Sequence, residues 1–256
     1  MFQIIQYITF LIRSTNQHGV HSPFIYDLVT KCFYDKSFFK DYVKLSQYRN
    51  SLLNNREIVE IKDLGSGSRI FKTSTRSISK IAKASGTPLQ RAKLIYRIVN
   101  YFKPKHTLEL GTSLGIATHA MALGNQENSI TSIEGCQNIS AIAKQQLIQQ
   151  NIKNVILEVG EFESQLQTLE GQQYDLIFFD GNHTNKATLN YFNTLVSNTH
   201  NDSVFIFDDI HWSKGMLEAW ETIKSHPKVT VTIDTFFWGF VFFRKEQVKE
   251  NFIIRL

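Results

Sequence analysis

The sequence predicts an α/β fold built on a doubly wound, mainly parallel sheet, and two observations lead to this prediction. From residue 107 onward, short apolar segments with strand character alternate with amphipathic segments of helical length. Parallel strands need a crossover connection, usually a helix, so this alternation is typical of a parallel sheet. The last two apolar segments are almost adjacent, which predicts an antiparallel hairpin and therefore a reversed last strand. Seven strands are expected, over residues 107–110, 129–134, 155–159, 174–180, 203–208, 229–234 and 237–244.

The composition is that of an ordinary globular protein. Of its 256 residues, 42% are hydrophobic and 20% are charged, which is enough to bury one large core. The two cysteines, Cys32 and Cys136, cannot form a disulfide framework and show no metal-ligand spacing. This favours a reducing, cytoplasmic location.

Residues 1–86 are predicted to be a helical extension of a sheet domain that spans residues 87–256. Residues 1–12 are apolar but too short to span a bilayer, and they lack the basic start and cleavage site of a signal peptide. We expect a helix that packs on the domain or forms a homodimer, with peripheral membrane contact as an alternative. Ser22 before Pro23 is typical of a further helix start, with the serine as the cap.

Positive charge is concentrated in the first part of the chain. Residues 1–106 hold 18 lysines and arginines against 6 acidic residues, whereas residues 107–256 hold 10 against 17. The basic segment 62–86 includes the linker-like sequence Gly-Ser-Gly-Ser at residues 65–68, so we predict that it is mobile. It is either a lid over an anionic ligand or a solvated linker. The charge also leaves RNA open as a partner.

The first strand of the sheet domain leads into a glycine turn. A helix is expected from Pro88 to about Lys103, and the strand at residues 107–110 follows. Gly111 and Gly115 then let the backbone turn sharply and approach a ligand where a Cβ would intrude. The amides that open the next helix point into this turn. The turn therefore predicts a ligand site at the carboxyl end of the strand.

Acidic residues follow the carboxyl ends of later strands. Glu134 ends the second strand, about twenty residues after the turn, where a carboxylate can accept both hydroxyls of a ribose. Glu161 follows the third strand, near the expected position of an adenine. Asp180 ends the fourth strand, and Asp208 and Asp209 end the fifth. Because carboxyl ends of parallel strands lie at one edge of a sheet, these acids predict one site.

This pattern resembles the class I S-adenosylmethionine-dependent methyltransferases over roughly residues 85–245. Their E/D-x-G-x-x-x-G motif corresponds to Glu109, Gly111 and Gly115, and their ribose-binding acid to Glu134. The G-x-G-x-x-G turn of dinucleotide-binding folds is absent. The resemblance implies a Rossmann-like fold with S-adenosylmethionine as the methyl donor. It also implies a cofactor site made of Glu109, Gly111, Thr112, Ser113, Gly115, Glu134, Glu161 and Asp180.

The second half resembles the metal-dependent O-methyltransferases of the catechol type and their sugar-modifying relatives. By this resemblance Asp180, Asp208 and Asp209 hold one Mg²⁺ or similar cation, although catechol-type enzymes often carry asparagine at the last position. A hard cation prefers oxygen ligands and keeps positions open for an acceptor with adjacent hydroxyls. His183 stands where catechol-type enzymes carry a lysine base, so His183 and Asp180 are the expected catalytic residues.

The sequence thus predicts O-methylation of a hydroxyl on a small molecule, by in-line transfer from the sulfonium. Methylation of RNA or of a lipid-linked sugar through the basic N-terminal region stays open, as does a non-catalytic S-adenosylmethionine-binding protein. Nucleic-acid N-methylating enzymes would carry an Asn/Asp-Pro-Pro-aromatic turn where this chain reads Asp180-Gly181-Asn182-His183. Cytosine C5 methylation needs a thiol nucleophile near the same face, and neither cysteine is placed for it.

Overall fold

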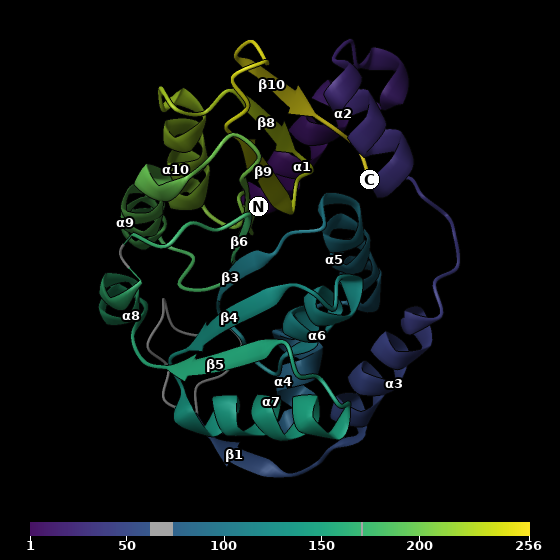
Figure 1. Ribbon diagram of the computed structural model, residues 1–256, viewed down its shortest axis with the longest axis vertical. Helices are drawn as coiled ribbons and strands as arrows, with labels where there is room; N and C mark the ends of the chain where they lie inside the picture. The colour runs from purple at the N-terminus through teal and green to yellow at the C-terminus, as the bar shows by residue number, and fades with distance from the viewer. Residues whose placement is uncertain (62–73, 170) are drawn as a thin grey trace. The chain divides into compact units, whose positions relative to one another are not determined.

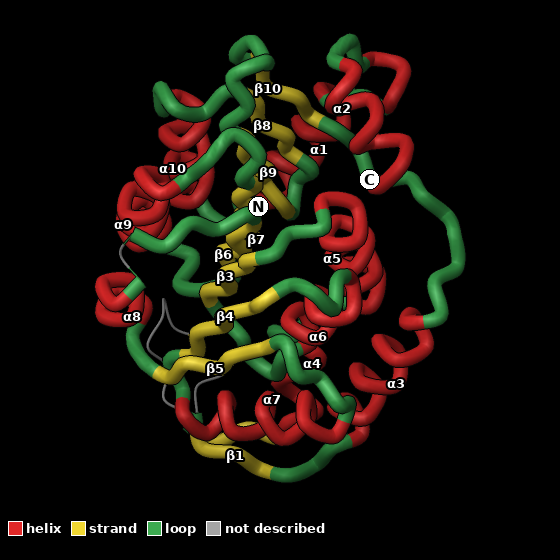
Figure 2. The backbone as a smooth tube through the Cα atoms, in the orientation of Figure 1, coloured by secondary structure: helices red, strands yellow, loops and turns green. Residues whose placement is uncertain are grey.

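The computed structural model (Figures 1 and 2) describes residues 1–61, 74–169 and 171–256. These residues form two compact units. The first unit combines Met1–Tyr34 with Leu169–Leu256, and the second unit is Asp35–Thr168. The predicted boundary after residue 86 falls inside the second unit, so the division into an extension and a sheet domain stays a prediction.

In the second unit, three parallel strands lie side by side in the order β3-β4-β5, and each one confirms a predicted strand. Each strand is followed by a helix, as the alternating pattern predicts. The strands are β3 (His106–Leu110), β4 (Ser129–Glu134) and β5 (Val155–Val159). The helices that follow them are α6 (Ile116–Gly124), α7 (Gln137–Gln149) and α8 (Phe162–Thr168).

The described part of the second unit also contains the helices α3 (Asp41–Asn54), α4 (Ile78–Ala84) and α5 (Leu89–Phe102). Helix α5 confirms the predicted helix: Pro88 precedes its first turn, and Lys103 ends it in a left-handed conformation with φ 48°. Helix α3 packs against α4, α5 and α6, so part of the predicted extension supports the glycine-turn region. The apolar face of α5 packs on α6.

A short antiparallel pair departs from the helical prediction for residues 1–86. Strand β1 (Ile58–Glu60) pairs with β2 (Thr75–Ser77). Three residues are too few to show the alternation that identifies a strand, and β1 is largely exposed. Within the predicted mobile segment 62–86, residues 62–73 lie outside the described residues, and the rest contains β2 and α4.

In the first unit the strand order is β10-β8-β9-β7-β6. Strands β6 and β7 are parallel, and β9 is antiparallel to both β7 and β8, which confirms the predicted hairpin and reversed strand. Strand β10 pairs parallel with β8 and was not predicted, because only one of its four residues is buried. The bounds are β6 (Leu176–Phe179), β7 (Val204–Asp208), β8 (Val231–Asp234), β9 (Trp238–Phe242) and β10 (Glu250–Ile253).

The phenylalanine-rich strands of the first unit are covered on both faces. On one face, Phe207 of β7 lies 6.5 Å from the ring of Trp220 in α10 (Lys214–Ser225), and α9 (Asn185–Leu195) packs beside α10. On the other face, Phe242 of β9 packs edge-to-face on Phe24 of α2 (Pro23–Leu28), with centroids 5.1 Å apart. Figure 1 shows α2 and α10 on opposite sides of these strands. The predicted cap at Ser22 is confirmed, since its hydroxyl accepts the amide of Ile25.

The N-terminal helix α1 (Phe2–Arg13) is also confirmed. Its inner face carries Tyr7 and Phe10, whose rings contact Phe236. Among the described residues, no helix has both the length and the apolarity needed to cross a membrane. A homodimer or a membrane contact through α1 stays a prediction. The outer face of α1 is apolar and exposed, and it carries Met1, Ile4, Ile5, Ile8 and Ile12.

Candidate functional site

The glycine turn of the second unit has the conformation that its glycines predict. Gly111 and Gly115 have φ angles of 108° and 74°, and Ser113 between them has φ 48°. Residues other than glycine rarely adopt such positive φ angles, so glycine at positions 111 and 115 lowers the conformational cost of the turn. The amides of Gly111 and Thr112 both donate to the carbonyl of Ile133 in β4, at 2.9 and 3.2 Å. The turn is therefore tied to the neighbouring strand before α6 begins.

The carboxylate of Glu134 lies against this turn. Its Oε2 accepts the amide of Ser113 at 2.8 Å, and its Oε1 accepts the amide of Cys136 at 2.9 Å. Glu134 is thereby held at the point where the turn meets the end of β4. The second unit thus brings together the predicted glycine turn and the predicted ribose-binding acid.

The motif acid Glu109 is fully buried within a chain of hydroxyl groups. Thr118 Oγ1 and Ser132 Oγ each donate to Glu109 Oε2 at 2.5 Å. Because the proton of Ser132 is used in this way, Thr112 Oγ1 donates to Ser132, also at 2.5 Å. Burial raises the pKa of Glu109 to about 8, although the two hydroxyl donors oppose this rise. Glu109 Oε1 is buried with no hydrogen-bond partner among the described residues.

The raised pKa of Glu109 predicts a pH-dependent stability. The unfolded chain loses this proton near pH 4.5 and the folded chain near pH 8, so wild-type stability should fall across that interval. The variant Glu109→Gln does not titrate there. Its free energy of unfolding should therefore rise relative to wild type by on the order of 3 kcal/mol between about pH 5 and pH 8.

Urea denaturation at several pH values measures this difference, with the exposed Glu127→Gln as the control variant. Parallel stability curves for Glu109→Gln and wild type would show that Glu109 is ionised in the folded protein.

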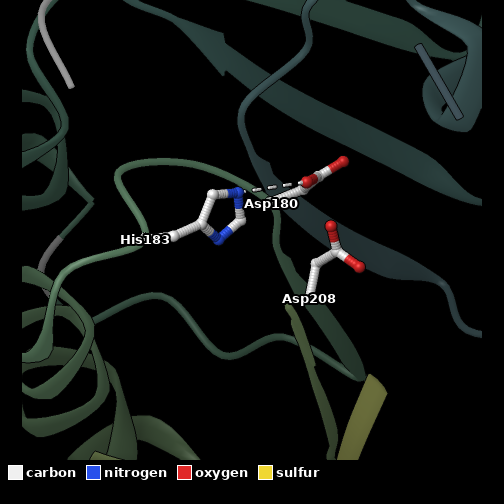
Figure 3. A group of neighbouring side chains, drawn as sticks. All are labelled: Asp180, His183 and Asp208. Atoms are coloured by element: carbon white, nitrogen blue, oxygen red, sulfur yellow. Dashed lines mark ion pairs between the residues drawn. The ribbon is translucent and has the colours of Figure 1, made fainter. Parts of the chain in front are cut away.

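In the first unit, two aspartates come together because they end adjacent parallel strands. Phe179 of β6 pairs with Phe207 of β7, so the next residues in the two strands, Asp180 and Asp208, lie side by side. His183 joins them, with its Nε2 3.7 Å from Asp180 Oδ1. Figure 3 shows this imidazole directed at the Asp180 carboxylate, with Asp208 beside it. One potential ligand atom from each of the three side chains lies within 4.8 Å of the others.

The loop after β6 turns His183 back toward Asp180. Asn182 has φ 50°, a left-handed conformation that asparagine tolerates better than most residues, and its carbonyl accepts the amide of Thr184 at 2.6 Å. Thr184 then caps α9 by accepting the amide of Ala187. The turn and the cap together fix the direction in which His183 leaves the backbone.

This donor set suits a divalent cation. Two carboxylates supply hard oxygen ligands, and an imidazole nitrogen is also a common metal ligand. Asp208 is 9% exposed, while the side chains of Asp180 and His183 are 22% and 23% exposed. The cluster is thus partly exposed to solvent, so a second molecule can reach a cation bound there.

Some predicted site residues have roles that neither the glycine turn nor the aspartate cluster accounts for. Asp209 has φ 54° and is not part of the metal-type cluster of described residues, so its role as a ligand stays a prediction. Glu161 is exposed, and its role in binding adenine also stays a prediction. Asp180 belongs to the first unit and the glycine turn to the second, so its predicted contact with the cofactor is likewise untested.

Sequence reasoning missed the hydroxyl groups that surround Glu109. Ser132 lies within the apolar strand β4, and a polar residue at a buried strand position is a usable signal. Thr118 gives no such signal, because threonine is common in helices without any role. A second missed feature is the buried pair of His211 Nε2 and Asp234 Oδ2, 2.8 Å apart.

Comparison with known proteins identifies similar folds. Residues 108–210 match a family model described as a methyltransferase domain. No curated protein matches the chain. Among solved structures, the S-adenosylhomocysteine-bound methyltransferase PaMTH1 of Podospora anserina is similar, with a TM-score of 0.62 and 14% identity over 89% of this chain and 98% of that one.

Two O-methyltransferases are also similar. TomG of Streptomyces achromogenes, which is involved in tomaymycin synthesis and was solved with S-adenosylmethionine, has a TM-score of 0.58 and 14% identity over 81% of this chain and 91% of that one. The Bacillus cereus enzyme, solved with S-adenosylhomocysteine, has a TM-score of 0.54 and 16% identity over 82% and 94%.

These matches confirm the predicted fold and the predicted resemblance. The stretch matched by the family model contains the glycine turn and Glu134, and it also contains Asp180 and Asp208. Residues 108–210 therefore resemble a methyltransferase domain, and the chain has the Rossmann-like fold of the class I S-adenosylmethionine-dependent methyltransferases.

Proposed function

We propose that this S-adenosylmethionine-dependent methyltransferase is a divalent-metal-assisted O-methyltransferase that acts on a hydroxyl of a small molecule. The observation that carries the proposal is the cluster of Asp180, His183 and Asp208 at the ends of adjacent strands. Two carboxylates beside an imidazole provide both cation ligands and a base. The O-methyltransferases among the similar structures support the same reaction class.

The glycine turn and its acids would hold the methyl donor. The residues fit this cofactor because the positive φ angles of Gly111 and Gly115 let the backbone approach a ligand closely, and because Glu109 Oε1 is a buried oxygen without a hydrogen-bond partner among the described residues. Bound S-adenosylmethionine supplies a methyl group on a positively charged sulfur. The chain's own contribution is to fix the donor in one orientation, which accounts for much of the acceleration in such transfers.

Asp180 and Asp208 would hold Mg²⁺ or a similar cation, with Asp209 as a proposed further ligand. A bound cation would lower the pKa of an acceptor hydroxyl and orient it. His183 would take the proton of that hydroxyl, because an imidazole nitrogen can act as a general base and this one lies in the cluster. A cation held by these side chains would keep coordination positions open. An acceptor with two adjacent hydroxyls would fill those positions, which favours this class of acceptor.

Replacing His183 separates the role of base from the role of ligand. We expect His183→Gln to lower turnover by about 100-fold or more, because the hydroxyl loses its proton acceptor. The affinity for Mn²⁺, measured by electron paramagnetic resonance, should change by less than about threefold, since the two aspartates remain. A loss of Mn²⁺ affinity as large as the loss of turnover would make His183 a metal ligand instead.

The proposed reaction is tested by screening methyl acceptors with labelled S-adenosylmethionine. The panel contains catechols, sugars with adjacent hydroxyls, lipid-linked sugars and RNA, each with Mg²⁺ and with EDTA. We expect labelling of a small hydroxyl compound that EDTA abolishes. Labelling that persists in EDTA would contradict the metal, and labelling of RNA or of lipid-linked sugars alone would contradict the acceptor class.

A further inference from the structure

A tyrosine from the N-terminal part of the chain reaches the glycine turn. Tyr48 lies on α3 and is fully buried, and its hydroxyl donates to the carbonyl of Leu114 at 2.8 Å. Leu114 stands between Ser113 and Gly115. The amide of Gly115 donates to the carbonyl of Thr112 at 2.9 Å. The peptide that joins Leu114 to Gly115 is therefore held at its oxygen by Tyr48 and at its nitrogen by the turn itself.

Tyr48 also closes one side of the turn. A Cβ built on Gly115 would lie 2.8 Å from the Tyr48 hydroxyl and 3.4 Å from Cβ of Ala143. The first distance is too short for a real Cβ contact, so a side chain at residue 115 would have to displace Tyr48. Residue 115 therefore needs to be glycine for two reasons: its φ is positive, and the Tyr48 hydroxyl lies where a Cβ would be.

The ring of Tyr48 is itself fixed in place. It stacks on the imidazole of His119 in α6, with centroids 4.5 Å apart and an interplanar angle of 24°. His119 is fully buried, and burial lowers its pKa to about 4, so the imidazole is neutral near pH 7. Burial also raises the pKa of Tyr48, which therefore keeps its proton and remains a donor.

We propose that Tyr48 is a positioning residue for the methyl donor, acting through the Leu114 carbonyl on the turn from Gly111 to Gly115. This inference rests on the proposed function, because the turn must bind S-adenosylmethionine for its shape to matter. It assigns a role to α3, which lies in the predicted N-terminal extension. Part of that extension then belongs to the cofactor site.

The test compares Tyr48→Phe with Tyr42→Phe by calorimetric titration with S-adenosylhomocysteine. Tyr42 is a matched control, since it lies on the same helix and is buried, but its hydroxyl accepts Arg97 Nη1 instead of contacting the turn. We expect Tyr48→Phe to weaken binding about fivefold to tenfold and Tyr42→Phe less than about twofold, with similar melting temperatures. Amide hydrogen exchange should rise in Tyr48→Phe around residues 111–118 only.

A double variant sharpens the test. Gly115→Ala should weaken binding strongly, and adding Tyr48→Phe should weaken it no further, because the missing hydroxyl makes room for the new methyl group. Additive losses, equal losses for both tyrosine variants, or wild-type affinity in Tyr48→Phe would each overturn the role of Tyr48. A wild-type protein that does not bind S-adenosylhomocysteine would instead overturn the proposed function together with this inference.

Discussion

Replacing Asp180 or Asp208 with asparagine is expected to lower metal-dependent turnover by at least about 100-fold while changing the affinity for S-adenosylmethionine by less than about twofold. Each change removes a negative charge from the pair that would hold the cation, at nearly constant side-chain volume. Both residues end strands of the first unit, whereas the glycine turn belongs to the second. Turnover at saturating Mg²⁺ and calorimetric titration with S-adenosylmethionine measure the two effects.

Asp202→Asn provides the control for this loss. Asp202 also lies in the first unit but is exposed, and it pairs with Arg244 at 2.9 Å. Its replacement should leave turnover unchanged, because exposed ion pairs contribute little. Unaltered turnover in Asp180→Asn would mean that the metal site is wrong, whatever the behaviour of the control.

Replacing Gly111 with valine is expected to weaken S-adenosylmethionine binding by at least about 100-fold. Gly111 has φ 108°, an angle that a β-branched side chain adopts only with strain. The variant should also place methyl groups where the backbone would approach the ligand. Mn²⁺ binding to the aspartate cluster should survive in this variant, which separates the loss of the donor site from general unfolding.

Gly171→Val is the matched control for backbone strain. Gly171 has φ 83°, and nothing lies within 4 Å of a Cβ built on it. This variant should lose a similar amount of stability and no cofactor affinity. If both glycine variants lost affinity equally, strain anywhere in the chain would explain the result, and the turn would not be the binding element.

The strands and their order along the chain were predictable because of how parallel strands are buried. The segments that became β6 and β7 are continuous apolar runs, Leu-Ile-Phe-Phe and Val-Phe-Ile-Phe, as expected for strands covered on both faces. Once β6 and β7 are parallel neighbours, the meeting of Asp180 and Asp208 follows from their position at the strand ends. Local sequence therefore sufficed for these two members of the cluster.

Features that depend on distant contacts were not predictable. Strands β1 and β10 are short and mostly exposed, so they carry no clear periodicity. The bond from Tyr48 to Leu114 joins residues 66 positions apart, and nothing near Tyr48 in sequence indicates its partner. The domain boundary after residue 86 stays a prediction.

The most direct test of the central claim is a calorimetric titration of the wild-type protein with S-adenosylmethionine, in Mg²⁺ and in EDTA. The glycine turn and Glu134 contain none of the proposed metal ligands, so donor binding should not need the metal. We expect one molecule bound per chain in both conditions, with methyl transfer to the acceptor only in Mg²⁺. Absence of binding in both conditions would contradict the assignment of the glycine turn as the donor site.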